Sequence, residues 1–233
     1  MRTQPLFVEL IGPAGAGKST LFRSLGRYDS VFPNPPFGVR QLRYLPYFLF
    51  FAALSLPVLL RQFANDRGYS WEETKKLVYL RGGRQFLPTP QTEPPSVVLL
   101  DQGPLFELAR FREFGPAVLR PEQIPRWWDN TLDRWTDVLD LVIWLDAEDE
   151  VLLRRINRRD VWHQTKELSA GDALGLLQRY RGAYQELASQ LRTRGQRTLI
   201  RIDTGQHSAN ETLDLAFRAI EEARSAATTA RSK

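Results

Sequence analysis

Residues 6–25 read LFVELIGPAGAGKSTLFRSL, and this stretch decides the fold. The apolar run from Leu6 to Ile11 predicts a strand buried on both faces, and Lys18 to Leu25 predicts a helix. Between them lies a match to Gly-x-x-x-x-Gly-Lys-Ser/Thr, a strong signal when a strand precedes it and a helix follows. The segment from Gly12 to Thr20 is therefore expected to bind a nucleoside triphosphate.

The glycines of this loop let backbone N–H groups converge on phosphate oxygens at the amino end of the helix. Lys18 is expected to meet the outer phosphates, and Ser19 to ligate Mg²⁺. A Gly-rich turn with a solvated lysine is the alternative, and the flanking strand and helix disfavour it. The predicted cofactors are ATP and Mg²⁺, and the predicted nucleotide-binding residues are Gly12, Pro13, Ala14, Gly15, Ala16, Gly17, Lys18, Ser19 and Thr20.

Three further β-rich runs are each followed by a helix-like segment: Val97 to Leu100, Leu141 to Leu145 and Thr198 to Ile202. Strands that alternate with helices indicate a parallel sheet covered on both sides. We therefore predict an α/β fold of the three-layer P-loop NTPase type, with a five-stranded parallel sheet in a single domain over residues 1–225. Residues 226–233 lack a hydrophobic period and are predicted to be disordered.

About 85 residues, rich in aromatics and prolines, separate the predicted strand at Leu6 to Ile11 from the one at Val97 to Leu100, too many for a simple crossover. They predict a helical insert over about residues 40–90, lying over the carboxyl edge of the sheet. Within it, Tyr44 to Leu60 carries no charge and is just long enough to approach a membrane-spanning length. Because Pro46 and Pro57 interrupt it, a buried or substrate-covering helix is favoured, with peripheral membrane contact as the alternative.

The composition narrows the partners. Thirty-two Lys and Arg against 27 Asp and Glu give a formal charge of +5, which suits an anionic ligand. Phosphorylated ligands satisfy this charge as well as nucleic acid does, and no aromatic-interleaved basic stripe indicates nucleic acid. The chain has no cysteine, which excludes thiol nucleophiles and thiolate metal sites. With no apolar signal region at the start, a cytoplasmic location is expected, and a homodimer is left open.

The strand ends argue against a signalling GTPase. Such proteins carry Asp-x-x-Gly after one strand and Asn-Lys-x-Asp after another, whereas this chain has Asp101-Gln102-Gly103, with the glycine one place early. Asn157 to Asp160 falls inside a helix predicted to begin near Glu148. A kinase acting on a small molecule fits the same region better.

Four arginines in that helix, Arg154, Arg155, Arg158 and Arg159, favour phosphoryl transfer. Arg155 and Arg159 are four residues apart and share a helix face, and arginines stabilise the negative charge of the transition state. We predict Lys18, Arg155 and Arg159 as catalytic, with a lid over about residues 158–172. The alternative for the arginines is a solvated helix face.

Asp101 ends a strand that is expected beside the phosphate loop, where ligands bind in parallel sheets. We predict it as a catalytic residue, either a general base or a magnesium ligand together with Ser19. The alternative is that Asp101 caps the helix that Pro104 begins, and the two roles are compatible.

The segment from Asp146 to Arg159 resembles the strand, helix and lid entrance of thymidylate kinases and their deoxynucleoside kinase relatives. Ile202 to Gln206, with the capped helix that follows, is similar to the last strand and helix of that family. The resemblance implies a nucleoside or nucleotide kinase. In the family the second strand ends in Asp-Arg or Glu-Arg, whereas this chain has Asp101-Gln102.

The predicted function is an ATP-dependent phosphotransferase acting on a small-molecule hydroxyl or a nucleotide-like acceptor. The alternative is a nucleotide-binding regulatory or assembly ATPase associated with a membrane or with polysaccharide machinery.

Overall fold

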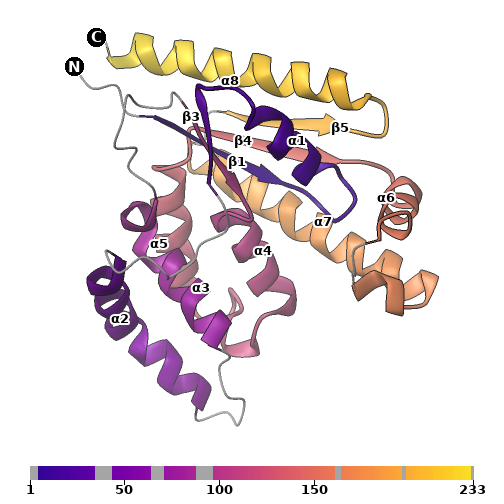
Figure 1. Cartoon of the computed structure of the whole chain (residues 1–233). Helices are drawn as coiled ribbons and strands as arrows, with labels where there is room; N and C mark the ends of the chain where they lie inside the picture. The colour runs from indigo at the N-terminus through magenta and orange to yellow at the C-terminus, as the bar shows by residue number, and fades with distance from the viewer. Residues whose placement is uncertain are drawn as a thin grey trace.

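A computed structural model describes residues 5–34, 44–63, 71–87, 97–160, 164–195 and 198–231. Its centre is one five-stranded parallel sheet in the order β2-β3-β1-β4-β5, which confirms the predicted α/β architecture (Figure 1). The strands are β1 (Leu6–Ile11), β2 (Val31–Asn34), β3 (Val97–Asp101), β4 (Leu141–Asp146) and β5 (Leu199–Asp203).

The sequence patterns did not locate β2. It reads VFPN and pairs only with β3, at the edge of the sheet. Pro33 has no N–H to donate to a second neighbour, so an edge position is where this residue is tolerated in a strand. Four residues with a proline among them offer too little alternation to predict a strand.

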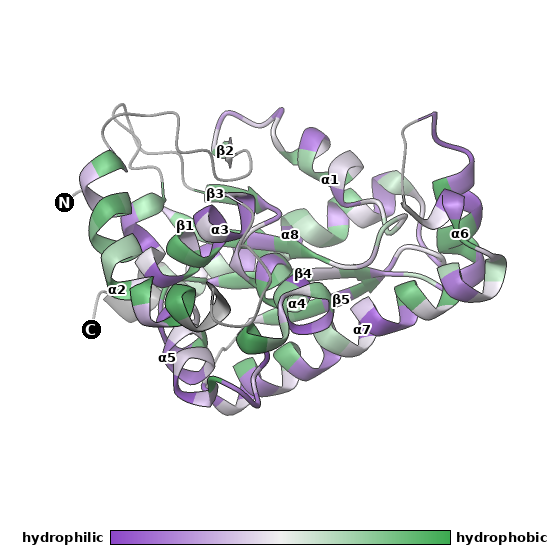
Figure 2. Ribbon diagram, turned by 90° about the horizontal axis from the view of Figure 1, so that it is seen from below, coloured by the Kyte–Doolittle hydropathy of each residue, from purple (hydrophilic) through white to green (hydrophobic). Residues whose placement is uncertain are grey.

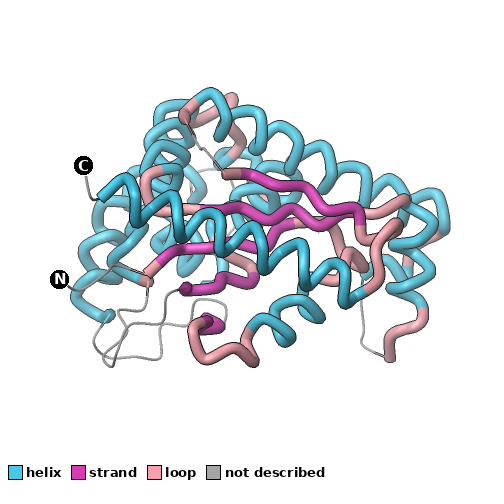
Figure 3. Tube along the Cα trace, turned by 90° about the horizontal axis from the view of Figure 1, so that it is seen from above, coloured by secondary structure: helices cyan, strands magenta, loops and turns pink. Residues whose placement is uncertain are grey.

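Helices cover both faces of the sheet, giving three layers (Figures 1 and 3). One side carries α1 and α8, whose Leu21, Leu25 and Ile220 join a core under the sheet. The other side carries α3, α4, α5 and α7. The helix bounds are α1 (Lys18–Leu25), α2 (Leu45–Phe63), α3 (Trp71–Gly82), α4 (Pro104–Phe114), α5 (Pro125–Thr136), α6 (Asp149–Asn157), α7 (Ala170–Thr193) and α8 (Ala209–Arg231), with short 3-10 helices η2 (Gly83–Phe86), η3 (Ala117–Leu119) and η4 (Gln164–Glu167).

The described part of the insert is helical, as α2, α3 and η2, but α3 packs against a face of the sheet instead of over the carboxyl edge, and α2 packs on α3. Leu80 accepts a hydrogen bond from the indole Nε1 of Trp135 in α5, at 3.0 Å. The guanidinium of Arg84 lies over the ring of Phe7, near the start of β1. The apolar side chains of α3 require a large buried area, and the sheet face supplies it.

The carboxyl-terminal helix corrects one prediction. Ser208 and Glu211 form a capping box at the start of this helix, with N···O distances of 2.7 and 3.3 Å. From this start α8 runs to Arg231, so residues 226–231 are helical and the prediction of a disordered tail is wrong for them. Alanine-rich sequence has a strong helix propensity even without an apolar stripe, which explains the error.

Within the described residues, no helix is both long enough and apolar enough to cross a membrane. The expected lid is described in part: a turn after α6, then η4 and the start of α7, with residues 161–163 outside the described ranges.

Candidate functional site

The predicted phosphate loop connects β1 to α1 at the carboxyl end of the central strand. Two of its glycines are dictated by the surroundings. Gly12 has φ +140°, and a Cβ there would lie 2.0 Å from the carbonyl oxygen of Leu145; Gly15 has φ +84°, and a Cβ would lie 2.7 Å from that of Leu152. The first turn of α1 carries no acidic residue, so its backbone N–H groups favour an anion.

Lys18 folds back over this loop. Its Nζ donates to the carbonyl oxygens of Gly12 at 2.7 Å and of Pro13 at 2.9 Å. Burial lowers the pKa of Lys18 to about 8, Asp101 opposes that shift, and Arg159 adds to it. The ammonium group is therefore held beside the loop by carbonyl oxygens that a triphosphate can replace as its partner.

Two cavities lie on the two sides of the loop. The larger, of about 330 Å³, is lined by residues that include Gly15, Gly17, Thr20, Arg155, Arg159 and Thr204. The smaller, of about 220 Å³, is lined by residues that include Gly12, Ala14, Lys18, Ser19, Asp101 and Gln102. Gly15, Gly17 and Arg159 line both. Ala16 is buried beneath the loop in the core.

Asp101 ends β3 and pairs in register with Leu10 of β1, which brings it to the smaller cavity beside Lys18 and Ser19. Burial raises the pKa of its carboxyl group, while Lys18 and the N–H of Gln102 lower it. The structure does not support the alternative role as a helix cap, because Gly103 is the cap residue of α4 and no side chain caps that helix from the cap position.

The side chain that accepts N–H groups at the start of α4 is instead that of Glu9, for which no role was predicted. It lies on β1, fully buried, and its two carboxyl oxygens accept the N–H groups of Leu105 at 3.1 Å and Phe106 at 3.0 Å. Burial raises the pKa of Glu9 to about 8, against the effect of those two N–H groups. A Cβ at Gly103 would lie 2.7 Å from the Glu9 carboxyl carbon. The signal was present: one acid within a strand that is otherwise apolar.

Gln102, between Asp101 and Gly103, is the only non-glycine residue with positive φ in the described chain, at 55°. A side chain in this left-handed region costs roughly 1–3 kcal/mol and persists where the surroundings enforce it. Here the surroundings are the turn between β3 and α4, which Glu9 holds. The Gln102 amide consequently lines the smaller cavity instead of following the strand outward.

The two predicted catalytic arginines are placed differently. Arg155 donates to the hydroxyl oxygen of Thr204 at 2.9 Å and to its carbonyl oxygen at 2.7 Å, with a longer contact of 3.5 Å to the Gly15 carbonyl oxygen. Arg159 follows the end of α6, which stops at Asn157, so the two arginines do not share a helix face as the sequence predicted. Both still line the larger cavity, and Arg159 alone of the two reaches the smaller one.

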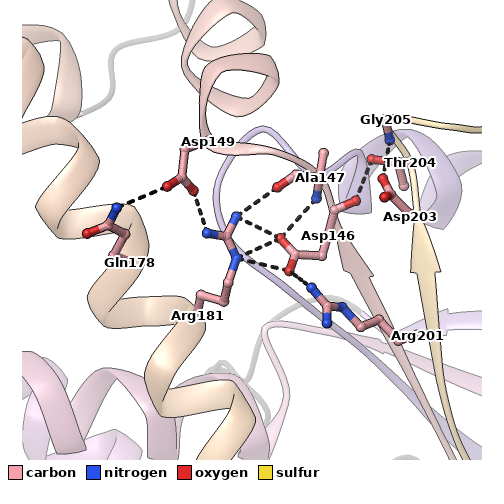
Figure 4. Close-up of polar contacts among 9 residues, drawn as sticks. All are labelled: Asp146, Ala147, Asp149, Gln178, Arg181, Arg201, Asp203, Thr204 and Gly205. Atoms are coloured by element: carbon pink, nitrogen blue, oxygen red, sulfur yellow. Dashed lines mark hydrogen bonds and ion pairs between the residues drawn. The ribbon is translucent and has the colours of Figure 1, made fainter.

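An ion network around the buried side chain of Asp146 supports this side of the site (Figure 4). Asp146, at the end of β4, accepts from Arg181 Nε at 3.0 Å and from Arg201 Nη2 at 2.7 Å. Its carbonyl oxygen accepts the Thr204 N–H at 2.7 Å. The acid at the end of β4 is thus engaged in joining α7, β5 and the loop that Arg155 contacts.

A phosphate loop after the central strand of a sheet ordered 2-3-1-4-5 defines the P-loop class of proteins. Comparison with solved structures shows which P-loop proteins this fold resembles. The chain is similar to thymidylate kinase from Candida albicans, with 15% identity, coverage of 95% of this chain and 94% of that one, and a TM-score of 0.55. The fold is that of the P-loop nucleoside and nucleotide kinases, as the resemblance implied.

Two structures of deoxyadenosine kinase from M. mycoides also match. The one with bound dCTP has 14% identity, covers 93% of this chain and 100% of that chain, and has a TM-score of 0.48. The one with dCMP and dCDP has 15% identity, covers 93% and 99%, and has a TM-score of 0.49. No protein-family model matches the sequence, and no curated protein matches it significantly.

Proposed function

We propose that the protein is an ATP-dependent phosphotransferase that acts on a hydroxyl group of a small molecule. The observation that carries this proposal is the position of the phosphate loop between two cavities that share Gly15, Gly17 and Arg159, while Asp101 lines only the smaller one. A nucleoside in the larger cavity and an acceptor in the smaller one would meet at the loop, where the terminal phosphate is expected.

In the proposed reaction an acceptor oxygen attacks the terminal phosphorus of ATP, the bond to the bridging oxygen breaks, and ADP leaves. The acceptor proton passes to the Asp101 carboxylate, which lies in the acceptor cavity. Lys18 and Arg159 are the cations that line that cavity among the described residues, and both are suited to the charge of the transferring group. Arg155, which donates hydrogen bonds to Thr204, holds the phosphate loop in place through its contact with the Gly15 carbonyl oxygen.

Magnesium fits the donor set. Ser19 supplies a hydroxyl oxygen, and the Asp101 carboxylate in the same cavity could hold the ion through a bound water while it takes the acceptor proton; Mg²⁺ in such sites keeps several waters and takes phosphate oxygens. Among the described residues, no group of three or more His, Cys, Asp or Glu could hold a metal alone, so a triphosphate would have to complete the site. When bound, Mg²⁺ would neutralise charge on the phosphates.

The acceptor cavity has aromatic walls, formed by Phe106, Tyr180 and Tyr184, with the neutral amide of Gln102 beside them. Rings and amides suit an acceptor that carries an uncharged ring and hydroxyl groups, such as a sugar or a nucleoside. A nucleotide-like acceptor is the second class, and the fold likeness to thymidylate kinase supports it. A cytoplasmic location, where ATP is available, belongs to the same proposal.

The proposal is tested with ATP labelled on the terminal phosphate, Mg²⁺, and a panel of sugars, nucleosides and nucleotides. We expect label to pass to at least one acceptor and the transfer to collapse in Lys18→Ala. Tight ATP binding with hydrolysis alone, and no labelled product from any acceptor, would instead favour the regulatory ATPase.

A further inference from the structure

The outward face of α2 is apolar along its length. Of the eleven large hydrophobic side chains exposed among the described residues, seven lie on this helix, and an eighth, Trp71, contacts Phe48 of α2 at a ring distance of 5.6 Å. Figure 2 shows the helix as a largely hydrophobic element at the margin of the molecule. The α2 apolar face consists of Leu45, Tyr47, Leu49, Phe50, Leu54, Leu56 and Leu60.

The opposite face of α2 is also apolar and is already covered. Phe48 and Phe51 are buried in the core. Ser55, the one serine between residues 45 and 60, points inward, where its hydroxyl donates to the Phe51 carbonyl oxygen at 2.8 Å. A helix that faces water places its polar residues outward, whereas α2 has its only serine inside and hydrocarbon outside. An exposed patch of this kind marks an interaction surface.

Several features of α2 argue against a membrane-spanning arrangement. The inner face is fixed to the protein core, and the described chain holds no helix apolar enough to cross. Pro57 lies inside α2 and has no N–H to donate to the carbonyl of Ala53. Such a carbonyl is satisfied by water at a membrane surface but not in the hydrocarbon centre.

Charge indicates what covers this face. Between Asp29 and Asp66 the sequence contains three arginines and no acidic residue, and two of them, Arg43 and Arg61, directly flank the uncharged stretch; the net charge of the chain is +5. A protein partner would be oriented by polar rim groups, yet the exposed positions of α2 between residues 45 and 60 offer only the Tyr47 hydroxyl. A fluid bilayer needs no such groups, and Tyr and Trp side chains are enriched at its interface.

We propose that α2 lies on the surface of an anionic lipid bilayer with the α2 apolar face buried among headgroups and upper acyl chains. In Figure 1 the helix lies away from the loop between β1 and α1. The nucleotide cavities therefore stay open to water while the protein is docked. The proposal concerns where the protein works, and it stands whether or not the phosphotransferase proposal holds.

The experiment is co-sedimentation of the full chain with vesicles of phosphatidylcholine alone or with about 30% phosphatidylserine. We expect binding to the anionic vesicles and much weaker binding to the neutral ones. The double variant Leu49→Glu, Phe50→Glu should partition roughly tenfold less, because two charges enter the apolar interface. Both side chains are exposed, so folding is preserved, and an unchanged Tm verifies this.

Leu168→Glu is the control, since Leu168 is an exposed leucine between η4 and α7, outside the α2 apolar face. It should bind vesicles like wild type. The proposal is overturned if the full chain ignores anionic vesicles, or if the double variant binds them unchanged. It is also overturned if light scattering shows a dimer that the double variant dissociates, because the face would then be an interface between two copies.

Discussion

Arg155 grips Thr204 with two hydrogen bonds, at 2.9 Å to the hydroxyl oxygen and 2.7 Å to the carbonyl oxygen. Thr204 in turn donates its N–H to the Asp146 carbonyl oxygen, and Asp146 is clamped by Arg181. The donor side of the candidate site is thus fixed by a continuous polar chain from α7 to the phosphate loop. These contacts favour a positioning role for Arg155, which the sequence predicts as catalytic.

Replacing Arg155 by methionine should therefore weaken nucleotide binding more than it slows transfer. We expect the KM for ATP to rise roughly tenfold or more with kcat within a few-fold, because uniform binding is lost. Arg154→Met is the matched control, one residue away and exposed, and it should leave both constants unchanged. A loss confined to kcat would place Arg155 at the transferring phosphate after all.

Asp101→Asn should have the opposite effect, lowering kcat much more than ATP binding. If its carboxylate takes the acceptor proton, kcat falls by about 10²–10⁴, while ATP affinity, measured by calorimetry without Mg²⁺, changes little. Burial raises the pKa of Asp101 above its usual 3.8, so the acid limb of the wild-type rate profile should lie above that value. Transfer undiminished in Asp101→Asn would remove its assigned role; Asp29→Asn, on an exposed turn, serves as the control.

Triphosphate affinity should fall in alkali because of Lys18. Burial lowers the pKa of its ammonium to about 8, so the free protein loses this charge as pH rises through about 8. We expect the Kd for ATP to increase steadily between about pH 7 and pH 9 by calorimetry. Lys18→Arg keeps its charge over this range, and its profile should be flat. A wild-type profile equally flat would contradict the low pKa.

The phosphate loop and its flanking elements could be predicted because each rests on contiguous residues: a buried strand, a glycine motif and a helix start. Asp101 could be placed because parallel strands end at one edge of a sheet. Glu9 and Thr204 could not be assigned roles in the same way. Their partners, Leu105 and Arg155, lie 96 and 49 residues away, and one sequence carries no record of such pairings.

The end of α6 shows a second kind of limit. Four arginines in six residues favour continuation of the helix, yet it stops at Asn157, which places Arg159 at the junction of both cavities. Helix propensity is a weak guide that tertiary contacts override, so it does not fix the residue at which a helix ends.

Removing the Asp146 carboxylate should destabilise the fold as a whole. Asp146→Ala removes the main partner of the largely buried Arg181, which keeps its ion pair with Asp149, so the cost should approach but not exceed the roughly 3 kcal/mol of a fully broken buried ion pair. Urea unfolding should show a lower midpoint with an unchanged m-value. Asp203→Ala, an exposed acid on the neighbouring strand, should cost much less. Equal losses would show that the network contributes no more than a surface charge.

Glu9 provides a prediction in which stability and pH are linked. Its pKa is raised from 4.5 to about 8 in the folded protein, so the folded state retains a proton that the unfolded state releases. The free energy of unfolding should then decline as pH rises from about 4.5 to about 8, by at most about 1.4 kcal/mol per pH unit from this one group. Denaturant unfolding at a series of pH values measures the slope.

In Glu9→Gln the free energy of unfolding should depend less on pH, and its curve should cross that of the wild type. The glutamine carbonyl can accept one of the N–H groups of Leu105 and Phe106, but its amide nitrogen cannot accept the other, so at acid pH the variant should be about 1 kcal/mol less stable. At alkaline pH the wild type must bury a carboxylate and loses that advantage. Glu122→Gln, at an exposed position, should follow the wild type throughout. Parallel curves for wild type and Glu9→Gln would mean that Glu9 is ionised in the fold at neutral pH, held by the two N–H groups at the start of α4.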